Sequence, residues 1–333
     1  MKFQPVTRYV KAVLLAGGVL SAAAGQAAIT FANGSDVGWV TQEEASGYKF
    51  YDHSAVQTDP FVLLKNQHIN AIRLRVWVNP AGGWNGAADV LAKAQRAAAQ
   101  GQRIMIDFHY SDSWADPGKQ NKPAAWAQDS LTQLYSDVYT HTQTTLNYLK
   151  SNGVMVDWVQ VGNEINGGML WPEGSTTHFD QLAQMINQGY DATKSVYPNA
   201  QVVVHLANGY KNADFRWFFD NLRNNGGKWD VIGMSHYPPV NNWSSYNKQI
   251  ATNMSDMVAR YGKPVVVAEV GMDYSQARTA NKMLSDLISK TKALGDNGQG
   301  VFYWEPEAYP GWQGYKLGAL GSNGQFTTAM DAF

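Results

Sequence analysis

The segment Trp158-Val-Gln-Val-Gly-Asn-Glu-Ile-Asn-Gly-Gly-Met-Leu-Trp171 combines a strand, a reactive group and a loop in fourteen residues. Its first four residues, Trp158 to Val161, form a short apolar run typical of a buried strand, and the Gly- and Asn-rich part predicts a loop. Asn163 and Glu164 fall where the strand should end. A carboxylate there is costly unless it is paired or used. Because strand tips carry the active site in barrels of alternating strands and helices, we interpret Glu164 as a catalytic candidate.

Strand-like and helix-like segments alternate about eight times along the rest of the chain. The expected strands are residues 36–40, 69–78, 103–108, 158–161, 201–206, 230–235, 263–268 and 300–303. The expected helices are residues 59–66, 87–100, 130–151, 179–197, 214–224, 246–261 and 277–294. This alternation favours a parallel sheet, and about eight units is the number in a closed barrel. We therefore expect the α/β class and a single-domain (β/α)8 TIM barrel over residues 28–333.

The N-terminus has the pattern of a secretory signal peptide. Lys2, Arg8 and Lys11 precede an apolar stretch, residues 12–25, that is too short to span a membrane comfortably. Small residues follow it, so we expect a signal peptide over residues 1–27, cleavage near Ala27 or Ala28, and an extracellular or periplasmic product. An N-terminal anchor helix is the alternative.

The composition excludes several classes of function. The formal net charge is −1, which offers no electrostatic attraction to nucleic acid or to an anionic membrane. The chain contains no Cys, so it forms no disulfides. The 12 Trp and 17 Tyr, with charged residues at only 16 %, suit a sugar ligand, whose apolar ring face stacks on indole. The oligomeric state stays open.

Two acids, Glu164 and Glu269, each follow an apolar run. Three strand–helix units separate them, so their tips can face each other across the mouth of a closed barrel. Glycoside hydrolysis needs two facing carboxylates, and their repulsion and burial would move their pKa values apart. In the alternative interpretation both acids are structural and pair with Arg75 and Lys263. Pairing with Arg75 fits both interpretations, because a catalytic nucleophile also needs a nearby cation to stay ionised.

His109 and His236 also follow strands, and Asp107 and Asp112 lie close to His109 in the sequence. The chain has no closely spaced pair of His residues, which makes a metal site a poor fit. We expect no metal and no cofactor, and we assign the two His residues to hydrogen bonding or stacking at the sugar site.

Four motifs resemble the endo-β-1,4-galactanases of glycoside hydrolase family 53, within a large clan of retaining (β/α) barrels. They are Arg73-Leu-Arg-Val-Trp-Val-Asn-Pro80, Asp107-Phe-His-Tyr-Ser-Asp-Ser-Trp-Ala-Asp-Pro-Gly118, Val161-Gly-Asn-Glu-Ile-Asn-Gly-Gly-Met-Leu-Trp-Pro172 and Tyr303-Trp-Glu-Pro306. The likeness runs over nearly all of the mature chain. The loop after Glu269, which carries calcium in some members of the family, is short here.

The resemblance implies roles for individual residues. Glu164 matches the acid/base, Glu269 the nucleophile, and Asn163 the residue that binds the sugar 2-hydroxyl. The substrate-binding candidates are Asn163, Arg75, His109, Asp112, Trp114, Trp171, His236, Tyr237 and Trp304. The implied substrate is the β-1,4-galactan of pectic arabinogalactan, cleaved with retention of configuration. The alternatives are a clan relative that acts on another β-1,4-glycan such as mannan, and a sugar-binding barrel without hydrolysis, which would have no need of two facing acids.

Overall fold

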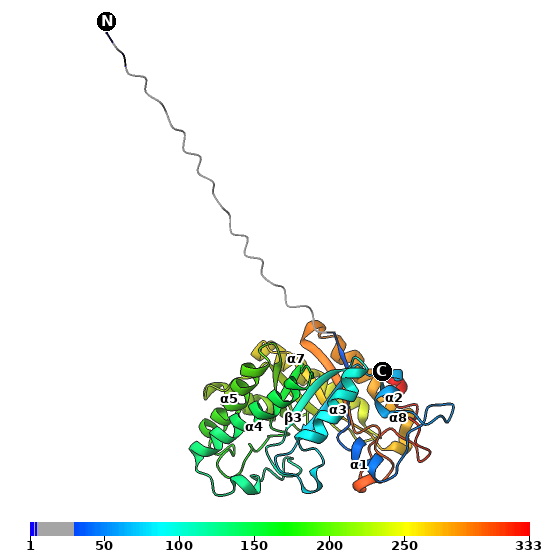
Figure 1. Cartoon of the computed structure of the whole chain (residues 1–333). Helices are drawn as coiled ribbons and strands as arrows, with labels where there is room; N and C mark the ends of the chain where they lie inside the picture. Colours follow the sequence, from blue (N-terminus) through cyan, green and yellow to red (C-terminus); the bar gives the residue numbers. More distant parts are fainter. Residues whose placement is uncertain (3, 5–29) are drawn as a thin grey trace.

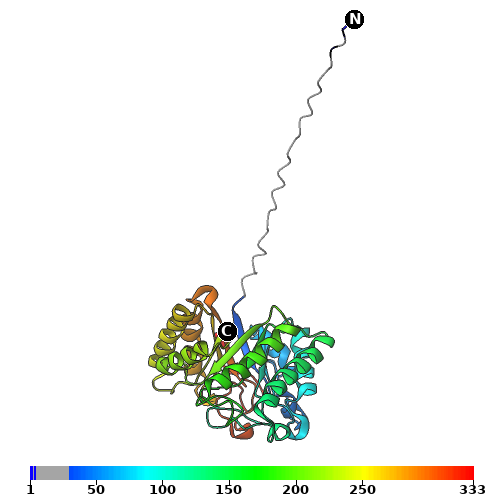
Figure 2. The same cartoon turned by 90° about the vertical axis from the view of Figure 1, so that its left-hand side faces the viewer.

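The computed structural model describes residues 1, 2, 4 and 30–333. The expected signal peptide falls almost entirely outside the described residues, and the expected cleavage site near Ala27 or Ala28 lies outside them. Within residues 30–333 a closed barrel of parallel strands follows the order β1 to β8, and helices surround it (Figures 1 and 2). The expected single-domain (β/α)8 barrel is confirmed. None of the helices in the described part is long and apolar enough to cross a membrane.

The elements follow one another as the alternating pattern predicts. The strands are β1 Ala32–Asp36, β2 Ala71–Val76, β3 Arg103–Phe108, β4 Trp158–Val161, β5 Gln201–Leu206, β6 Val231–His236, β7 Val265–Val270 and β8 Gly298–Trp304. The main helices are α1 Val40–Ala45, α2 Pro60–Asn66, α3 Ala87–Ala99, α4 Leu131–Ser151, α5 Phe179–Val196, α6 Asn212–Asn224, α7 Trp243–Tyr261 and α8 Ala277–Lys292. Asp59 caps α2 as expected, because its carboxylate accepts from the Phe61 amide at 2.7 Å.

The expectation for the first strand is wrong. We expected it at residues 36–40, but β1 is Ala32–Asp36, and Val40 begins α1. The segment Ala-Asn-Gly-Ser-Asp lacks an apolar pattern because the interior beside it is already filled. A Cβ on Gly34 would lie 2.2 Å from the ring of Phe302, so only Gly fits there.

Two apolar layers leave a polar layer at the mouth of the barrel. One large cluster packs between the strands and the helices. A second cluster contains eight buried residues: Ala32, Ala71, Met105, Trp158, Val203, Val231, Val266 and Phe302. Successive residues of a strand point to opposite faces, so positions two further along, such as Arg73, Asp107 and Gln160, share this inward face nearer the C-terminal ends. Polar groups therefore converge at the mouth, where the candidate catalytic residues lie.

Candidate active site

A pocket of about 340 Å³ opens among the strand tips and brings Glu164 and Glu269 together. Its lining residues are His109, Trp114, Ala115, Asp116, Lys119, Asn163, Glu164, Tyr237, Glu269, Trp304, Tyr315 and Leu317. Seven of the residues proposed from the sequence are in this set. The sequence interpretation did not assign a role to the other five lining residues. Ala115 and Asp116 lie within the motif of residues 107–118, whereas Lys119, Tyr315 and Leu317 come from loops without a recognised motif.

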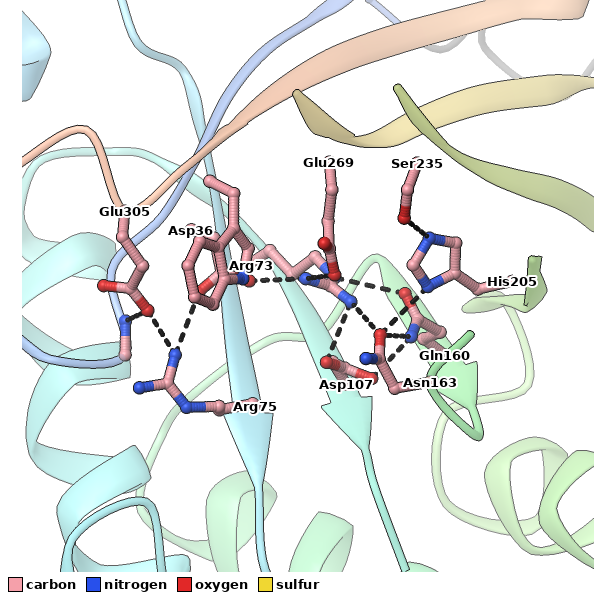
Figure 3. Close-up of polar contacts among 12 residues, drawn as sticks. Asp36, Arg73, Arg75, Asp107, Gln160, Asn163, His205, Ser235, Glu269 and Glu305 are labelled. Carbon is pink, nitrogen blue, oxygen red and sulfur yellow. Dashed lines mark hydrogen bonds and ion pairs between the residues drawn. The ribbon is translucent and has the colours of Figure 1, made fainter. Parts of the chain in front are cut away.

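Glu269 at the tip of β7 is held by a cation and by a phenol. Arg73 Nη1 lies 3.0 Å from its Oε1, and the Tyr237 hydroxyl donates to its Oε2 at 2.9 Å. Arg73 also pairs with Asp36 at 2.5 Å and with Asp107 at 2.8 Å, so three carboxylates share one buried guanidinium (Figure 3). The cation beside the proposed nucleophile is therefore Arg73, which corrects the expectation of Arg75.

Arg75 lies behind the pocket wall and does not line the pocket. Its guanidinium forms an ion pair with Glu305, which also accepts from the amides of Gly38 and Trp39. Four indoles surround the guanidinium, with ring centroids 4.4–6.0 Å from Cζ: Trp39, Trp77, Trp114 and Trp304. Cation–π attraction thus supports Trp114 and Trp304 from behind, and both of them line the pocket.

The two candidate carboxyl groups differ in their surroundings. Burial and the nearby charge of Glu269 raise the pKa of Glu164 to about 8. Burial also raises the pKa of Glu269, to about 7, but the Arg73 guanidinium opposes this shift by favouring the ionised form. The Arg73 ion pair therefore favours the anion on Glu269, whereas the direct partner of Glu164 is the uncharged Ser235 hydroxyl. Such a difference suits a pair that needs one acid and one anion.

Asn163 is fixed from both ends of its amide. Its Nδ2 donates to the Ala115 carbonyl at 2.9 Å, while its Oδ1 accepts from Arg73 Nη2 at 2.9 Å and from Gln160 Nε2 at 3.1 Å. Since Arg73 can only donate, the atom that faces it must be the oxygen. His205 Nδ1 lies 3.0 Å from the same oxygen. Asn163 is 6 % exposed, and it lines the pocket in one orientation.

His109 lies in the pocket wall, and its hydrogen bonds determine its tautomer. Its Nδ1 accepts from the Ala115 amide at 3.1 Å and from Trp77 Nε1 at 3.3 Å. The proton of the neutral ring therefore sits on Nε2, which lies 3.0 Å from Asp107 Oδ2. Burial alone would raise the pKa of Asp107, but Arg73 and His109 hold it below its ordinary value.

Three further candidates do not reach the pocket. The Asp112 carboxylate accepts from the amides of Asn79 and Ala124 at 2.8 Å each and joins two loops. Trp171 Nε1 donates to the Gly167 carbonyl at 2.9 Å within its own loop. His236 is fully buried, and its Nε2 lies 2.8 Å from Asn247 Oδ1 on α7. The structure therefore does not bring these three residues together with Glu164 and Glu269 in the pocket.

The error at His236 has a simple geometric cause. Neighbouring residues of a strand point to opposite faces, and at this tip Ser235 points inward. Its hydroxyl donates to Glu164 Oε1 at 2.6 Å and lies 2.8 Å from His205 Nε2. The sequence interpretation missed Ser235 and His205. Alternation with apolar neighbours along β5 and β6 was the available signal.

The residues do not favour a metal centre. Within residues 30–333, no group of three or more His, Asp or Glu side chains is arranged to hold a metal ion. Asp36, Asp107 and Glu269 converge, but the Arg73 guanidinium occupies the space among them.

The chain matches a known family over the whole barrel. The family model described as Glycosyl hydrolase family 53 matches residues 32–333. Arabinogalactan endo-beta-1,4-galactanase A of Emericella nidulans is 32% identical over 308 residues, which cover 86% of each chain. The solved Ignisphaera aggregans GH53 catalytic domain is 31% identical, with a TM-score of 0.83 and coverage of 93% of this chain and 96% of that chain. A structure from work on two fungal beta-1,4-galactanases is 27% identical, with a TM-score of 0.84 and coverage of 92% and 99%.

Proposed function

Because this chain belongs to glycosyl hydrolase family 53, we propose that it is an endo-β-1,4-galactanase that cleaves galactan with retention of configuration. The names of its relatives support the substrate, since they are called arabinogalactan endo-beta-1,4-galactanase in Emericella nidulans and endo-beta-1,4-galactanase in Bacillus subtilis. The observation that carries the proposal is the pair of unlike carboxyl groups, Glu164 and Glu269, in one pocket at the mouth of the barrel.

The proposed reaction is a double displacement. The Glu269 carboxylate attacks the anomeric carbon, while the Glu164 proton passes to the leaving oxygen as the glycosidic C–O bond breaks. Glu164, now ionised, then takes a proton from water, whose oxygen attacks the anomeric carbon and releases Glu269. Arg73 and Tyr237 support this scheme, because both favour the anionic form of Glu269 through a charge and a hydrogen bond.

The pocket wall supports a polysaccharide substrate. Trp114 and Trp304 present indoles to the pocket, and His109 and Asn163 present polar groups. Stacked aromatic rings with a few fixed polar groups are typical of ligand sites. We propose that the natural substrate is the galactan of pectic arabinogalactan.

A substrate panel tests the proposal. We expect reducing-sugar release from β-1,4-galactan to exceed release from β-1,4-mannan and xylan, with internal cleavage in size-exclusion profiles and β-configured first products in NMR spectra. Faster release from mannan than from galactan, or α-configured first products, would overturn it.

We further propose that the protein is exported. The charged start, the short apolar stretch and the small residues near Ala27 motivate this proposal. N-terminal sequencing of protein from the periplasm or culture medium should find a start near Ala28. An intact Met1 would contradict cleavage there, and retention of the protein in the cytoplasm would contradict export.

A further inference from the structure

A chain of hydrogen bonds leads from Glu164 into the barrel through Ser235 and His205, which do not line the pocket. Glu164 Oε1 lies 2.6 Å from the Ser235 hydroxyl, which lies 2.8 Å from His205 Nε2. His205 Nδ1 then lies 3.0 Å from Asn163 Oδ1. Ser235 and His205 are 2 % and 0 % exposed, and they come from β6 and β5 (Figure 3). The chain therefore connects Glu164 with Asn163 entirely through buried groups.

The partners of His205 determine where its proton sits. Asn163 Oδ1 is an acceptor because it faces Arg73, so His205 must donate from Nδ1. Burial and the nearby Arg73 charge hold the pKa of His205 well below its ordinary value, so the ring is neutral. A neutral ring with its proton on Nδ1 has a bare lone pair on Nε2. The group that faces this lone pair is the Ser235 hydroxyl.

Ser235 has only one hydroxyl proton for two acceptors. When Glu164 is protonated, it donates to Ser235 Oγ, and Ser235 in turn donates to His205 Nε2, so every group in the chain is satisfied. When Glu164 is ionised, the hydroxyl turns to the carboxylate and leaves Nε2 of His205 buried without a donor. An unpaired buried acceptor carries a free-energy cost, so the neutral ring favours the state in which Glu164 holds its proton.

We propose that Ser235 and His205 form a hydroxyl switch that returns Glu164 to its protonated form between turnovers. The inference rests on the acid/base role in the proposed function. In the first step the Glu164 proton turns from Ser235 Oγ to the glycosidic oxygen, and the Ser235 hydroxyl turns toward the resulting carboxylate. The hydroxyl turns back to His205 when Glu164 takes a proton from water. Both are positioning residues, since they act on the substrate only through Glu164.

Other charged groups also act on Glu164 and His205, so a test of the switch must leave these groups in place. Glu269, Arg73 and Asp116 act on Glu164, while Arg73, Asp107 and His109 act on His205. None of them is altered by a substitution at position 205 or 235. Because the His205 ring is neutral, its removal changes hydrogen bonding without removing a charge.

A double-mutant cycle tests the switch through the pKa of Glu164, measured by ¹³C carboxyl NMR in the unliganded protein, with Glu164→Gln to assign the signal. His205→Phe removes the acceptor, so Ser235 becomes free to donate to Glu164. We expect the pKa of Glu164 to fall by about half a unit to one unit, the shift that corresponds to one hydrogen bond. In the Ser235→Ala background the same substitution should leave this pKa unchanged, and in the Ser235→Thr background, which retains a hydroxyl, the fall should return.

His236→Phe is the matched control, because it removes a neighbouring buried His that bonds to Asn247 and faces away from the pocket. It should leave the pKa of Glu164 unchanged. His205→Leu replaces His205→Phe if the larger ring does not fold, since it also removes the acceptor. The switch would be overturned if the pKa of Glu164 were unchanged or raised in folded His205 variants. It would also be overturned if this pKa fell equally with Ser235 present and in the Ser235→Ala background.

The NMR titration needs no substrate, so it separates this inference from the proposed function. Failure to cleave galactan would refute the function and leave the pKa cycle intact, whereas an active enzyme with no coupling would refute the switch alone. In an active enzyme, the alkaline limb of kcat/KM on galactan should move to lower pH in His205→Phe by the same amount. With an activated aryl leaving group this limb should not move, because the first step then needs no proton.

Discussion

At the scale of single residues, Glu164 and Glu269 carry the same functional group in different surroundings. Glu269 receives an ion pair from Arg73 and a hydrogen bond from Tyr237, and both favour its anion. Glu164 has a serine hydroxyl as its direct partner and lies near the negative charge of Glu269. Distinct protonation therefore follows from the neighbours of each carboxyl group rather than from the residue type.

This difference predicts separate failures for the two alanine variants. Glu164→Ala should still glycosylate itself with an activated aryl galactoside and then stall, and added azide should restore turnover as the β-galactosyl azide. Glu269→Ala should fail at the first step with every substrate, and any azide rescue should give the α-product. On galactan, Glu164→Ala should lose about a hundred- to ten-thousand-fold in kcat/KM.

Steady-state rates, product NMR and thermal midpoints measure these outcomes. Glu173→Ala is the control, because Glu173 forms an ion pair with Lys122 outside the pocket. Near-normal galactan cleavage by Glu164→Ala would refute the assignment of the pair.

At the scale of elements, Trp304 and Trp171 differ in where they lie relative to the strand tips. Trp304 ends β8, lines the pocket and packs edge-on against Trp39 at 5.1 Å. Trp171 lies in the loop between β4 and α5, where its backbone amide donates to the Gln120 carbonyl at 2.8 Å and its ring donates to Gly167. The first Trp is therefore placed to touch a sugar, and the second to hold two loops together.

The two Trp residues should respond differently to alanine. Trp304→Ala should raise KM for galactan about tenfold or more, equivalent to ~1.4 kcal/mol, because a stacking face is lost. Trp171→Ala should leave KM within a small factor and should lower the free energy of unfolding by about 1–3 kcal/mol, because a partly buried ring and its hydrogen bond are removed. Kinetics on folded protein and urea denaturation separate the effects. A rise in KM for Trp171→Ala without loss of stability would return Trp171 to the substrate site.

At the scale of the whole molecule, buried acids near the β1–β8 seam make stability depend on pH. Burial raises the pKa of Glu43 to about 8. Burial and the nearby charge of Glu305 raise the pKa of Glu307 well above its ordinary value. Glu307 is fully buried, and neither of its carboxylate oxygens has a hydrogen-bond partner among the described residues. The folded protein therefore binds protons at these groups that the unfolded chain has released at neutral pH.

The sign of the effect follows from this difference. A folded-state pKa above the unfolded value gives stability that is fully present below about pH 4.5 and is lost as pH rises toward 8 for Glu43 and further for Glu307. Each group contributes a slope of up to about 1.4 kcal/mol per pH unit. Glu307→Gln, which stays neutral, should match the wild type at pH 5 and show a higher thermal midpoint at pH 8.

Thermal unfolding across this pH range measures the effect. Asp331→Asn is the control, because it removes a carboxyl group from an exposed position. Its thermal midpoint should change between pH 5 and pH 8 by the same amount as that of the wild type. A thermal midpoint of Glu307→Gln that falls with pH as steeply as the wild type would show that Glu307 does not carry this proton.

The amino-acid sequence alone was sufficient for the barrel and for the positions of Glu164 and Glu269. Apolar runs and helical periods repeat along the chain, and in a parallel barrel all strand tips meet at one end, so local patterns were enough. The exception was β1, whose small residues carry no hydrophobic signal because Phe302 fills the space beside Gly34.

The tertiary structure alone decided which of two candidate side chains meets each carboxyl group. Arg73 rather than Arg75 meets Glu269, and Ser235 rather than His236 meets Glu164. Arg73 and Arg75 lie two positions apart on the same face of β2, so they differ in their height along the strand, whereas Ser235 and His236 are adjacent and point to opposite sides. The pairing of β6 with β7 is irregular between Met234 and Ser235, just before the tip that carries the serine. This shift decides which residue of β7 lies beside Ser235, and it arises from how the neighbouring strands pack.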